Sequence, residues 1–261
     1  MILATITCCS SLALGAETKQ ATVEINKVTE NAYKEKPMNE MASESFAKGF
    51  ALQKLGDYDG AVKAYDESIK IDPNYPDFYF FKCSALGASR KWDEAIKACD
   101  ISIRLEPQGG RFYNVKGQIL SLSGKYEEAI LSFNEAIKLN LNIAEVYSEK
   151  AGALISVGKY NEAIESCNEA IKIEPDYPAA HYNKGVSLEG VGQYSEAYKE
   201  YEEAITLQPD YIDAYNNAGC ILISAGMYKK AMEIFDHALK IDPNHPKILK
   251  NREYAISAMK E

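Results

Sequence analysis

One heptapeptide pattern recurs six times in this chain at a constant spacing. The copies are GDYDGAV, RKWDEAI, GKYEEAI, GKYNEAI, GQYSEAY and GMYKKAM, which begin at Gly56, Arg90, Gly124, Gly158, Gly192 and Gly226. A fixed period in the range of roughly 20–50 residues indicates a stack of similar structural units, because one such unit cannot bury its apolar face alone. The pattern therefore serves the fold, since a catalytic motif has no reason to be copied at a fixed spacing.

The period divides the chain into six consecutive repeats without a single insertion: 42–75, 76–109, 110–143, 144–177, 178–211 and 212–245. Within each repeat, position 11 is always Leu, position 17 is always aromatic, position 20 is always Ala and position 8 is always small. Positions 4, 8 and 11 share one helical face, and positions 20, 24 and 27 share another, so each repeat is predicted to contain two amphipathic helices. The small residues let the two helix backbones approach closely.

Glycine and proline mark the ends of the predicted helices. Position 15 is Gly in five repeats and Arg90 in the second, and we expect a positive φ there at the end of the first helix. Five of the nine prolines stand at position 32, and three more open the segment that follows. Both places suit a residue that lacks a backbone N–H.

These features resemble the tetratricopeptide repeat family, whose 34-residue helix–turn–helix units carry the same residue types at these positions. The resemblance covers the six repeats, residues 42–245, and implies an all-α, right-handed α-solenoid. Two departures are local. Leu141 stands where position 32 is usually Pro, and Lys replaces the usual Leu at position 7 of five repeats. Those lysines either form a charged ladder or lay their stems along the packing surface with the ammonium groups in water.

The segments outside the repeats have different compositions. Residues 246–261 continue as one amphipathic helix, which we interpret as a cap on the exposed last repeat. Residues 17–41 are polar and form a tether, with a weak pattern for one helix. Residues 1–16 are uncharged and mostly apolar, which fits either a signal peptide without its basic n-region or a disordered tail. The localisation is therefore open between cytoplasmic and exported.

Charge and cysteine usage limit the possible partners. The net charge of −9 argues against nucleic acid, because phosphate binding needs clustered Lys and Arg. No apolar run is long enough for an integral membrane span. Cys83, Cys99, Cys167 and Cys220 fall at packing positions without disulfide-like spacing, so we expect them to be free, although Cys83 and Cys99 lie on the two helices of one repeat.

The sequence offers no catalytic constellation. The three histidines, His181, His237 and His245, stand at unrelated repeat positions without Cys or carboxylate partners at ligand spacing. The glycines recur as helix ends, so they do not form a phosphate-binding loop. We therefore expect no enzyme activity, no metal and no cofactor.

Binding is expected instead on the first helix of each repeat, which lines the concave groove in the family that the chain resembles. The candidate residues for binding a peptide or partner protein are Phe46, Phe50, Phe80, Phe81, Arg111, Asn114, Gln118, Tyr182, Asn183, Asn216 and Asn217. The four phenylalanines either form an exposed apolar anchor site, or are covered by residues 17–41 folding back over them, or pad the end of the solenoid. The asparagines either clamp a peptide backbone or form a solvated polar face.

The basic residues by which chaperone-binding members of the family grip a C-terminal carboxylate are absent, because Phe46, Phe50, Phe81, Glu145 and Glu149 occupy those positions. The function expected from the sequence is thus a non-catalytic protein–protein interaction scaffold that binds a peptide segment or partner protein in its groove. The alternative is a self-assembling structural module that forms homo-oligomers through the phenylalanines or the ends of the solenoid.

Overall fold

The computed structural model describes residues 40–259, and all regular secondary structure in this range is α-helical. The predicted all-α fold of successive helix pairs is confirmed. The expectations for residues 1–16 and for most of the segment 17–41 lie outside the described residues. The first described helix begins at Glu40, just before the first predicted repeat.

The described residues form two compact halves, residues 40–142 and residues 143–259, each of which is described by itself. The helices of the N-terminal half are α2 (Glu40–Lys54), α3 (Tyr58–Ile71), α4 (Pro76–Ala88), α5 (Trp92–Leu105), α6 (Gly110–Leu122) and α7 (Tyr126–Lys138). Those of the C-terminal half are α8 (Ala144–Ser156), α9 (Tyr160–Ile173), α10 (Pro178–Gly190), α11 (Tyr194–Leu207), α12 (Ile212–Ser224), α13 (Tyr228–Ile241) and α14 (Pro246–Ala258).

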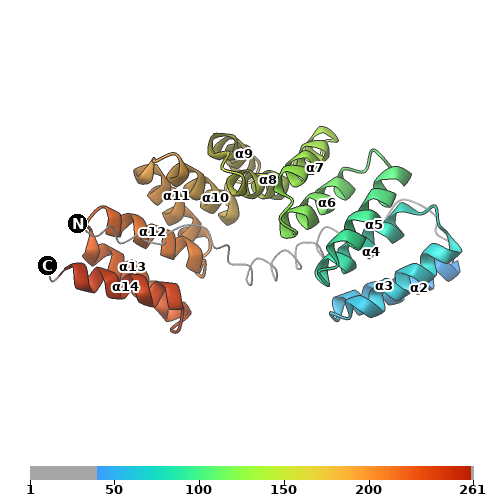
Figure 1. The fold of residues 1–261 in the computed structure, drawn as a ribbon, viewed down its shortest axis with the longest axis horizontal. Coiled ribbons are helices and arrows are strands. Elements are labelled where there is room, and N and C mark those ends of the chain that lie inside the picture. The colour runs from blue at the N-terminus through green and yellow to red at the C-terminus, as the bar shows by residue number, and fades with distance from the viewer. Residues whose placement is uncertain (1–39, 260–261) are drawn as a thin grey trace. The chain divides into compact units, whose positions relative to one another are not determined.

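Each repeat forms one hairpin of two helices that lie side by side (Figure 1). Within each half, the second helix of a hairpin also packs against the first helix of the next hairpin. The final helix α14 packs against α13 and α12 in the same way. Equivalent helices of neighbouring repeats therefore make the same kinds of contact along each half.

The turn within each hairpin has the positive φ that the glycines at position 15 predict. The five glycines there have φ between 72° and 81°, and Arg90 adopts the same conformation with φ of 60°. A side chain other than Gly is strained in this region. The second repeat nevertheless keeps the same turn with Arg90. The packing of the hairpin, which the other repeats share, holds Arg90 in place.

Glycine at position 8 allows an aromatic ring at position 24 to lie directly on the first helix. A Cβ atom added at Gly49, Gly117, Gly185 or Gly219 would lie 2.6, 2.6, 2.6 or 2.3 Å from the ring of Tyr65, Phe133, Tyr201 or Phe235, respectively. All four rings are fully buried. Close contact between a helix backbone and a ring therefore forms the centre of these hairpins.

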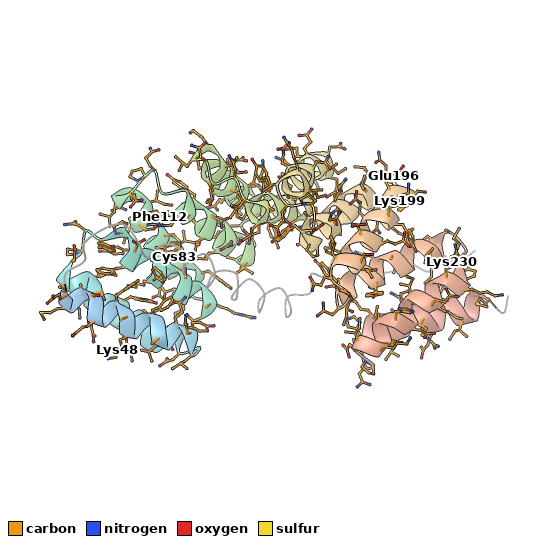
Figure 2. All side chains as sticks on the ribbon, turned by 180° about the vertical axis from the view of Figure 1, so that it is seen from behind. Lys48, Cys83, Phe112, Glu196, Lys199 and Lys230 are labelled. Carbon is orange, nitrogen blue, oxygen red and sulfur yellow. A yellow bond between two sulfur atoms is a disulfide. The ribbon has the colours of Figure 1, made fainter. Side chains whose placement is uncertain are left out.

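The second repeat replaces this glycine–aromatic contact with a disulfide. Cys83 on α4 and Cys99 on α5, which occupy positions 8 and 24, are bonded, with their Cα atoms 5.4 Å apart. Figure 2 shows Cys83 among the packed helices of the N-terminal half. The expectation that these cysteines are free is wrong, because two helices that approach closely enough for a ring to lie on a glycine also bring two Cβ atoms within disulfide reach. Cys167 and Cys220 are free and buried.

The cations at position 7 form ion pairs between neighbouring helices. Lys82 pairs with Asp66 (2.6 Å), Lys116 with Asp100 (2.7 Å) and Arg252 with Asp236 (2.5 Å), each with the acid at position 25 of the preceding repeat. Of the five lysines considered from the sequence, Lys82 and Lys116 make this contact, and Lys184 pairs instead with Glu200 of its own repeat. The charged ladder is therefore present only in part. The side chains are partly exposed, so each pair contributes little stability.

Candidate functional site

A ladder of three asparagines links the first helices of the C-terminal half. Asn183, Asn217 and Asn251 stand at the same position of α10, α12 and α14, and each donates its amide N–H to the preceding first helix. The hydrogen bonds join Asn183 Nδ2 to Ser148 Oγ (3.2 Å), Asn217 Nδ2 to Tyr182 Oη (3.5 Å) and Asn251 Nδ2 to Asn216 Oδ1 (2.9 Å). We call these three residues the asparagine ladder. In each of the three, the preceding first helix holds the amide nitrogen.

The ladder leaves hydrogen-bond acceptors for a ligand. Asn217 Oδ1 accepts from Asn216 Nδ2 at 3.2 Å, whereas no donor among residues 40–259 bonds to Oδ1 of Asn183 or Asn251. All three ladder residues are half-buried. An amide whose N–H₂ is already held presents its carbonyl oxygen in a fixed direction, which suits a backbone N–H of a bound peptide.

Tyr201 extends from the second helix α11 to the ladder. Its ring lies on Gly185, where an added Cβ would be 2.6 Å away, and its hydroxyl lies between two groups of the first helices. Tyr201 Oη donates to Glu189 Oε2 at 2.9 Å and accepts from Asn217 Nδ2 at 3.3 Å. The Tyr182 ring packs against those of Tyr201 and Tyr211, with centroids 5.8 and 4.9 Å apart. A carboxylate, a phenol, an amide and two further aromatic rings thus lie next to the ladder.

Burial shifts the pKa of both titratable groups in this cluster. Burial raises the pKa of Tyr201 well above 10, with the nearby Glu189 charge acting in the same direction, so the phenol is a permanent donor. Burial also raises the pKa of Glu189, although the hydrogen bond from Tyr201 opposes this. The pKa of Glu189 is therefore shifted by desolvation, and no nearby cation lowers it.

Three of the four predicted phenylalanines belong to the core of the N-terminal half. Phe46, Phe80 and Phe81 are 2%, 0% and 1% exposed, so they do not form an exposed apolar patch. Phe46 and Phe81 pack edge to face at 4.9 Å, and Phe80 packs on Phe112 at 5.3 Å. Phe50 is half-buried against Phe81. Sequence alone could not distinguish a groove position from a core position here, because an apolar side chain suits both.

The polar candidates of the N-terminal half differ in whether they already have interaction partners. Arg111 forms an ion pair with Asp77 at 2.7 Å, and its guanidinium lies 4.7 Å from the centroid of the Phe112 ring. Its positive charge is therefore already paired within the chain. Asn114 and Gln118 are buried on the same face of α6. Neither amide atom of Asn114 has a hydrogen-bond partner within residues 40–259. An unpaired buried amide costs about 1–3 kcal/mol, so Asn114 stays a candidate for ligand binding.

Residues 40–259 show neither a metal site nor a membrane-spanning helix. Residues 40–259 contain no group of three His, Cys, Asp or Glu side chains placed to hold a metal ion. Within the same range, no helix combines the length and the apolar character needed to cross a bilayer.

The sequence matches models of a known repeat family. A TPR repeat model matches residues 49–81 and 151–192, and two further tetratricopeptide repeat models match residues 82–140 and 188–250. The matches together span 49–140 and 151–250. The chain belongs to the tetratricopeptide repeat family. No curated protein sequence matches it.

Several solved structures are similar to this tetratricopeptide repeat chain. YrrB, a TPR protein with an unusual peptide-binding site, is 20% identical over 74% of this chain and 99% of its own, with a TM-score of 0.59. MamA is 25% identical over 66% of this chain and 94% of its own, with a TM-score of 0.59. PilW, a type IV pilus biogenesis factor, is 14% identical over 81% of this chain and 98% of its own, with a TM-score of 0.73. These likenesses establish the fold of this chain.

Two residues of the candidate site in this tetratricopeptide repeat chain, Asn251 and Tyr201, are not among the residues chosen from the sequence. Asn251 lies in the helix that the sequence predicts to be a cap. It stands one period after Asn217 and two periods after Asn183, so the repeat period contained the signal. Tyr201 was assigned to packing, because position 24 is a core position in every repeat. Its hydroxyl reaches the ladder because Gly185 has no side chain to block the ring. Since Asn251 continues the ladder, helix α14 resembles the first helix of a further repeat.

His181 is a buried titratable residue of this tetratricopeptide repeat protein, and both of its ring nitrogens face hydrogen-bond acceptors. Its Nδ1 lies 2.7 Å from Glu200 Oε2 and its Nε2 lies 2.9 Å from the Pro175 carbonyl oxygen. Both partners are acceptors, so only the doubly protonated ring satisfies both bonds. The hydrogen bond to Glu200 raises the pKa of His181, against the opposing effect of burial. Burial alone would raise the pKa of Glu200, but hydrogen bonds from His181 and Lys184 outweigh it and lower that pKa.

A folded-state pKa above the unfolded value means that His181 stabilises the fold fully below about pH 6.5 and loses this effect as the pH rises through its folded pKa. We expect the thermal midpoint of the full chain to fall between pH 6 and 8.5. The fall should be smaller in His181→Tyr, because the equivalent Tyr215 donates a neutral hydroxyl to the Pro209 carbonyl. Circular dichroism melts of both proteins at each pH measure this, and parallel pH profiles would contradict it.

Proposed function

We propose that this chain is a non-catalytic scaffold whose C-terminal half binds an extended peptide segment of a partner protein along the asparagine ladder. The observation that carries the proposal is the way in which the three amides are bonded. Each has its nitrogen engaged by the preceding first helix, and two keep an unused carbonyl oxygen. Such a row of acceptors matches a peptide backbone, whose N–H groups recur at constant spacing.

The spacing of the ladder predicts how the peptide would bind. Packed helices lie about 8–10 Å apart, and a chain in the extended polyproline II conformation advances about 3.1 Å per residue and repeats its orientation every three residues. About every third backbone N–H of the peptide therefore meets a ladder residue. Similarity to YrrB supports a peptide ligand for this architecture, although the residues that would bind it here are those of this chain.

The test begins with a phage-displayed library of random dodecapeptides selected on the full chain. Binding of the selected peptides to each variant is then measured by fluorescence anisotropy. The triple variant Asn183→Ala, Asn217→Ala, Asn251→Ala is expected to lose about 30-fold in affinity, because it removes the two unused acceptors and each lost hydrogen bond is worth about 1 kcal/mol. Asn161→Ala, on an exposed part of α9, is the matched control and should bind normally.

A second measurement separates backbone recognition from other contacts. Peptides methylated at one backbone nitrogen at a time should lose affinity at about every third residue and nowhere else. Uniform sensitivity, or full binding by the triple variant with an unchanged circular dichroism spectrum, would contradict a role for the ladder.

Self-assembly stays as the alternative function. The burial of Phe46, Phe80 and Phe81 removes one of the two surfaces expected for it, whereas Leu249, Tyr254 and Met259 at the C-terminal end are exposed large apolar side chains that favour it. Light scattering of the full chain decides between the two, because a monomeric mass at all concentrations rules out self-assembly.

A further inference from the structure

Glu189 is a partly buried carboxylate that has no cation. It stands on α10 with one oxygen, Oε2, bonded to the Tyr201 hydroxyl, and no Lys, Arg or His within residues 40–259 forms an ion pair with it. Two other partly buried acids in the chain are treated differently. Glu200 contacts both His181 and Lys184, at 2.7 and 2.6 Å, and Asp77 contacts Arg111. A desolvated carboxylate without a cation is costly, so its retention calls for an explanation.

The first repeat shows that packing does not need this charge. There, Tyr65 at position 24 donates its hydroxyl to Oε1 of Gln53 at position 12, over 2.9 Å. In the fifth repeat, Tyr201 donates to Glu189 from the same positions over the same distance. A neutral amide therefore holds the tyrosine as well as a carboxylate does. The negative charge of Glu189 is additional to the structural role.

The surroundings of Glu189 suit a long basic side chain. The same Tyr201 hydroxyl that holds the carboxylate also bonds to Asn217 of the ladder, so a peptide on the ladder passes next to Glu189. The Tyr182 ring packs between those of Tyr201 and Tyr211. Aromatic faces accept the methylene stem of Lys or Arg and attract its cationic end.

We propose that Glu189 receives the side chain of a Lys or Arg residue of the bound peptide, so that the C-terminal half selects basic segments. This inference rests on the proposed function, because it needs a peptide on the asparagine ladder. The free oxygen Oε1 supplies the acceptor for the ammonium or guanidinium group, and Tyr201 fixes its position. Burial, which raises the pKa of this carboxyl, also strengthens its attraction for a cation once the peptide excludes water.

The variant that isolates the charge is Glu189→Gln, since Gln53 shows that Gln keeps the bond to tyrosine. Peptides selected by the full chain are synthesised in matched pairs, with Lys replaced by norleucine or Arg by citrulline. At low salt, the full chain is expected to prefer the charged peptide by about tenfold or more, as close ion pairs at interfaces do. Glu189→Gln should erase this preference, keep the affinity for the neutral peptide and leave the thermal midpoint unchanged or raised.

Each outcome decides a different point. A preference for Lys or Arg that survives in Glu189→Gln would overturn the role of Glu189 while leaving the ladder intact. Selected peptides without basic residues would overturn it as well. If the triple asparagine variant binds the same peptides normally, or if no peptide is selected at all, the proposed function fails and this inference fails with it.

Discussion

Removal of the Cys83–Cys99 disulfide is expected to destabilise the N-terminal half by about 3 kcal/mol. The bond joins α4 and α5 across a sequence separation of 16 residues, and a cross-link of about this length restricts the unfolded chain by that amount. Both cysteines are fully buried, so the double variant Cys83→Ala, Cys99→Ala also leaves unfilled space. Urea unfolding of the full chain, followed by circular dichroism, measures the loss.

A repair variant tests the reason for the loss. Cys83→Gly with Cys99→Phe rebuilds the contact that Gly117 and Phe133 make in the third repeat. It should be more stable than the double alanine variant and insensitive to a phosphine reductant, whereas the parent chain loses stability on reduction. Alkylation of the denatured, unreduced chain should modify Cys167 and Cys220 and spare Cys83 and Cys99. Modification of all four, with no effect of reductant, would contradict the disulfide.

Gly219→Ala is expected to destabilise the C-terminal half by about 1–3 kcal/mol. The new Cβ would lie 2.3 Å from the Phe235 ring, which is fully buried, so the ring or the helix must shift. Overpacking of a tight core has this cost. The effect opposes helix propensity, which favours Ala over Gly by about 1 kcal/mol inside a helix.

The same substitution at Gly152 is the matched control. Gly152 lies inside α8 of the same half, and a Cβ there meets only Asn183 Nδ2 at 3.9 Å. Gly152→Ala should therefore stabilise the chain by up to about 1 kcal/mol. Thermal melts of both variants measure the difference, and a shift in the same direction for both would show that the ring contact is not the cause.

The disulfide also bears on the redox environment of the chain. Free buried thiols are common in a reducing compartment, whereas a buried disulfide is typical of an oxidising one. The sequence spacing of Cys83 and Cys99 did not indicate a disulfide, because the bond depends on the distance between two helices. That distance is short here, as it is in the four repeats where the ring at position 24 lies against the glycine at position 8.

Periodicity made most of the fold predictable from the sequence. The helix pairs, the turn at position 15 and the small residues at the helix contacts all depend on local spacing, and each is copied six times. Even the unusual Arg90 was correctly placed in a turn, because its neighbours in the pattern were glycines. Agreement among six copies gave each assignment a weight that a single copy lacks.

The candidate site was predictable only in part. Asn183, Asn216 and Asn217 were chosen from their repeat positions, and the structure brings them into contact with one another or with neighbouring helices. Phe46, Phe80 and Phe81 were chosen by the same reasoning and are core residues. Repeat position specifies the helix face of a residue, but it does not specify what covers that face.

The sequence alone determined the helical repeat, because that information is local and periodic. Only the tertiary structure decided which side chains meet across repeats: the disulfide in place of a ring on glycine, the ladder that continues to Asn251, and the hydroxyl of Tyr201 beside Glu189. These contacts join residues 12 to 35 positions apart on different helices. Their existence depends on how closely the helices pack, and that distance is a property of the folded chain.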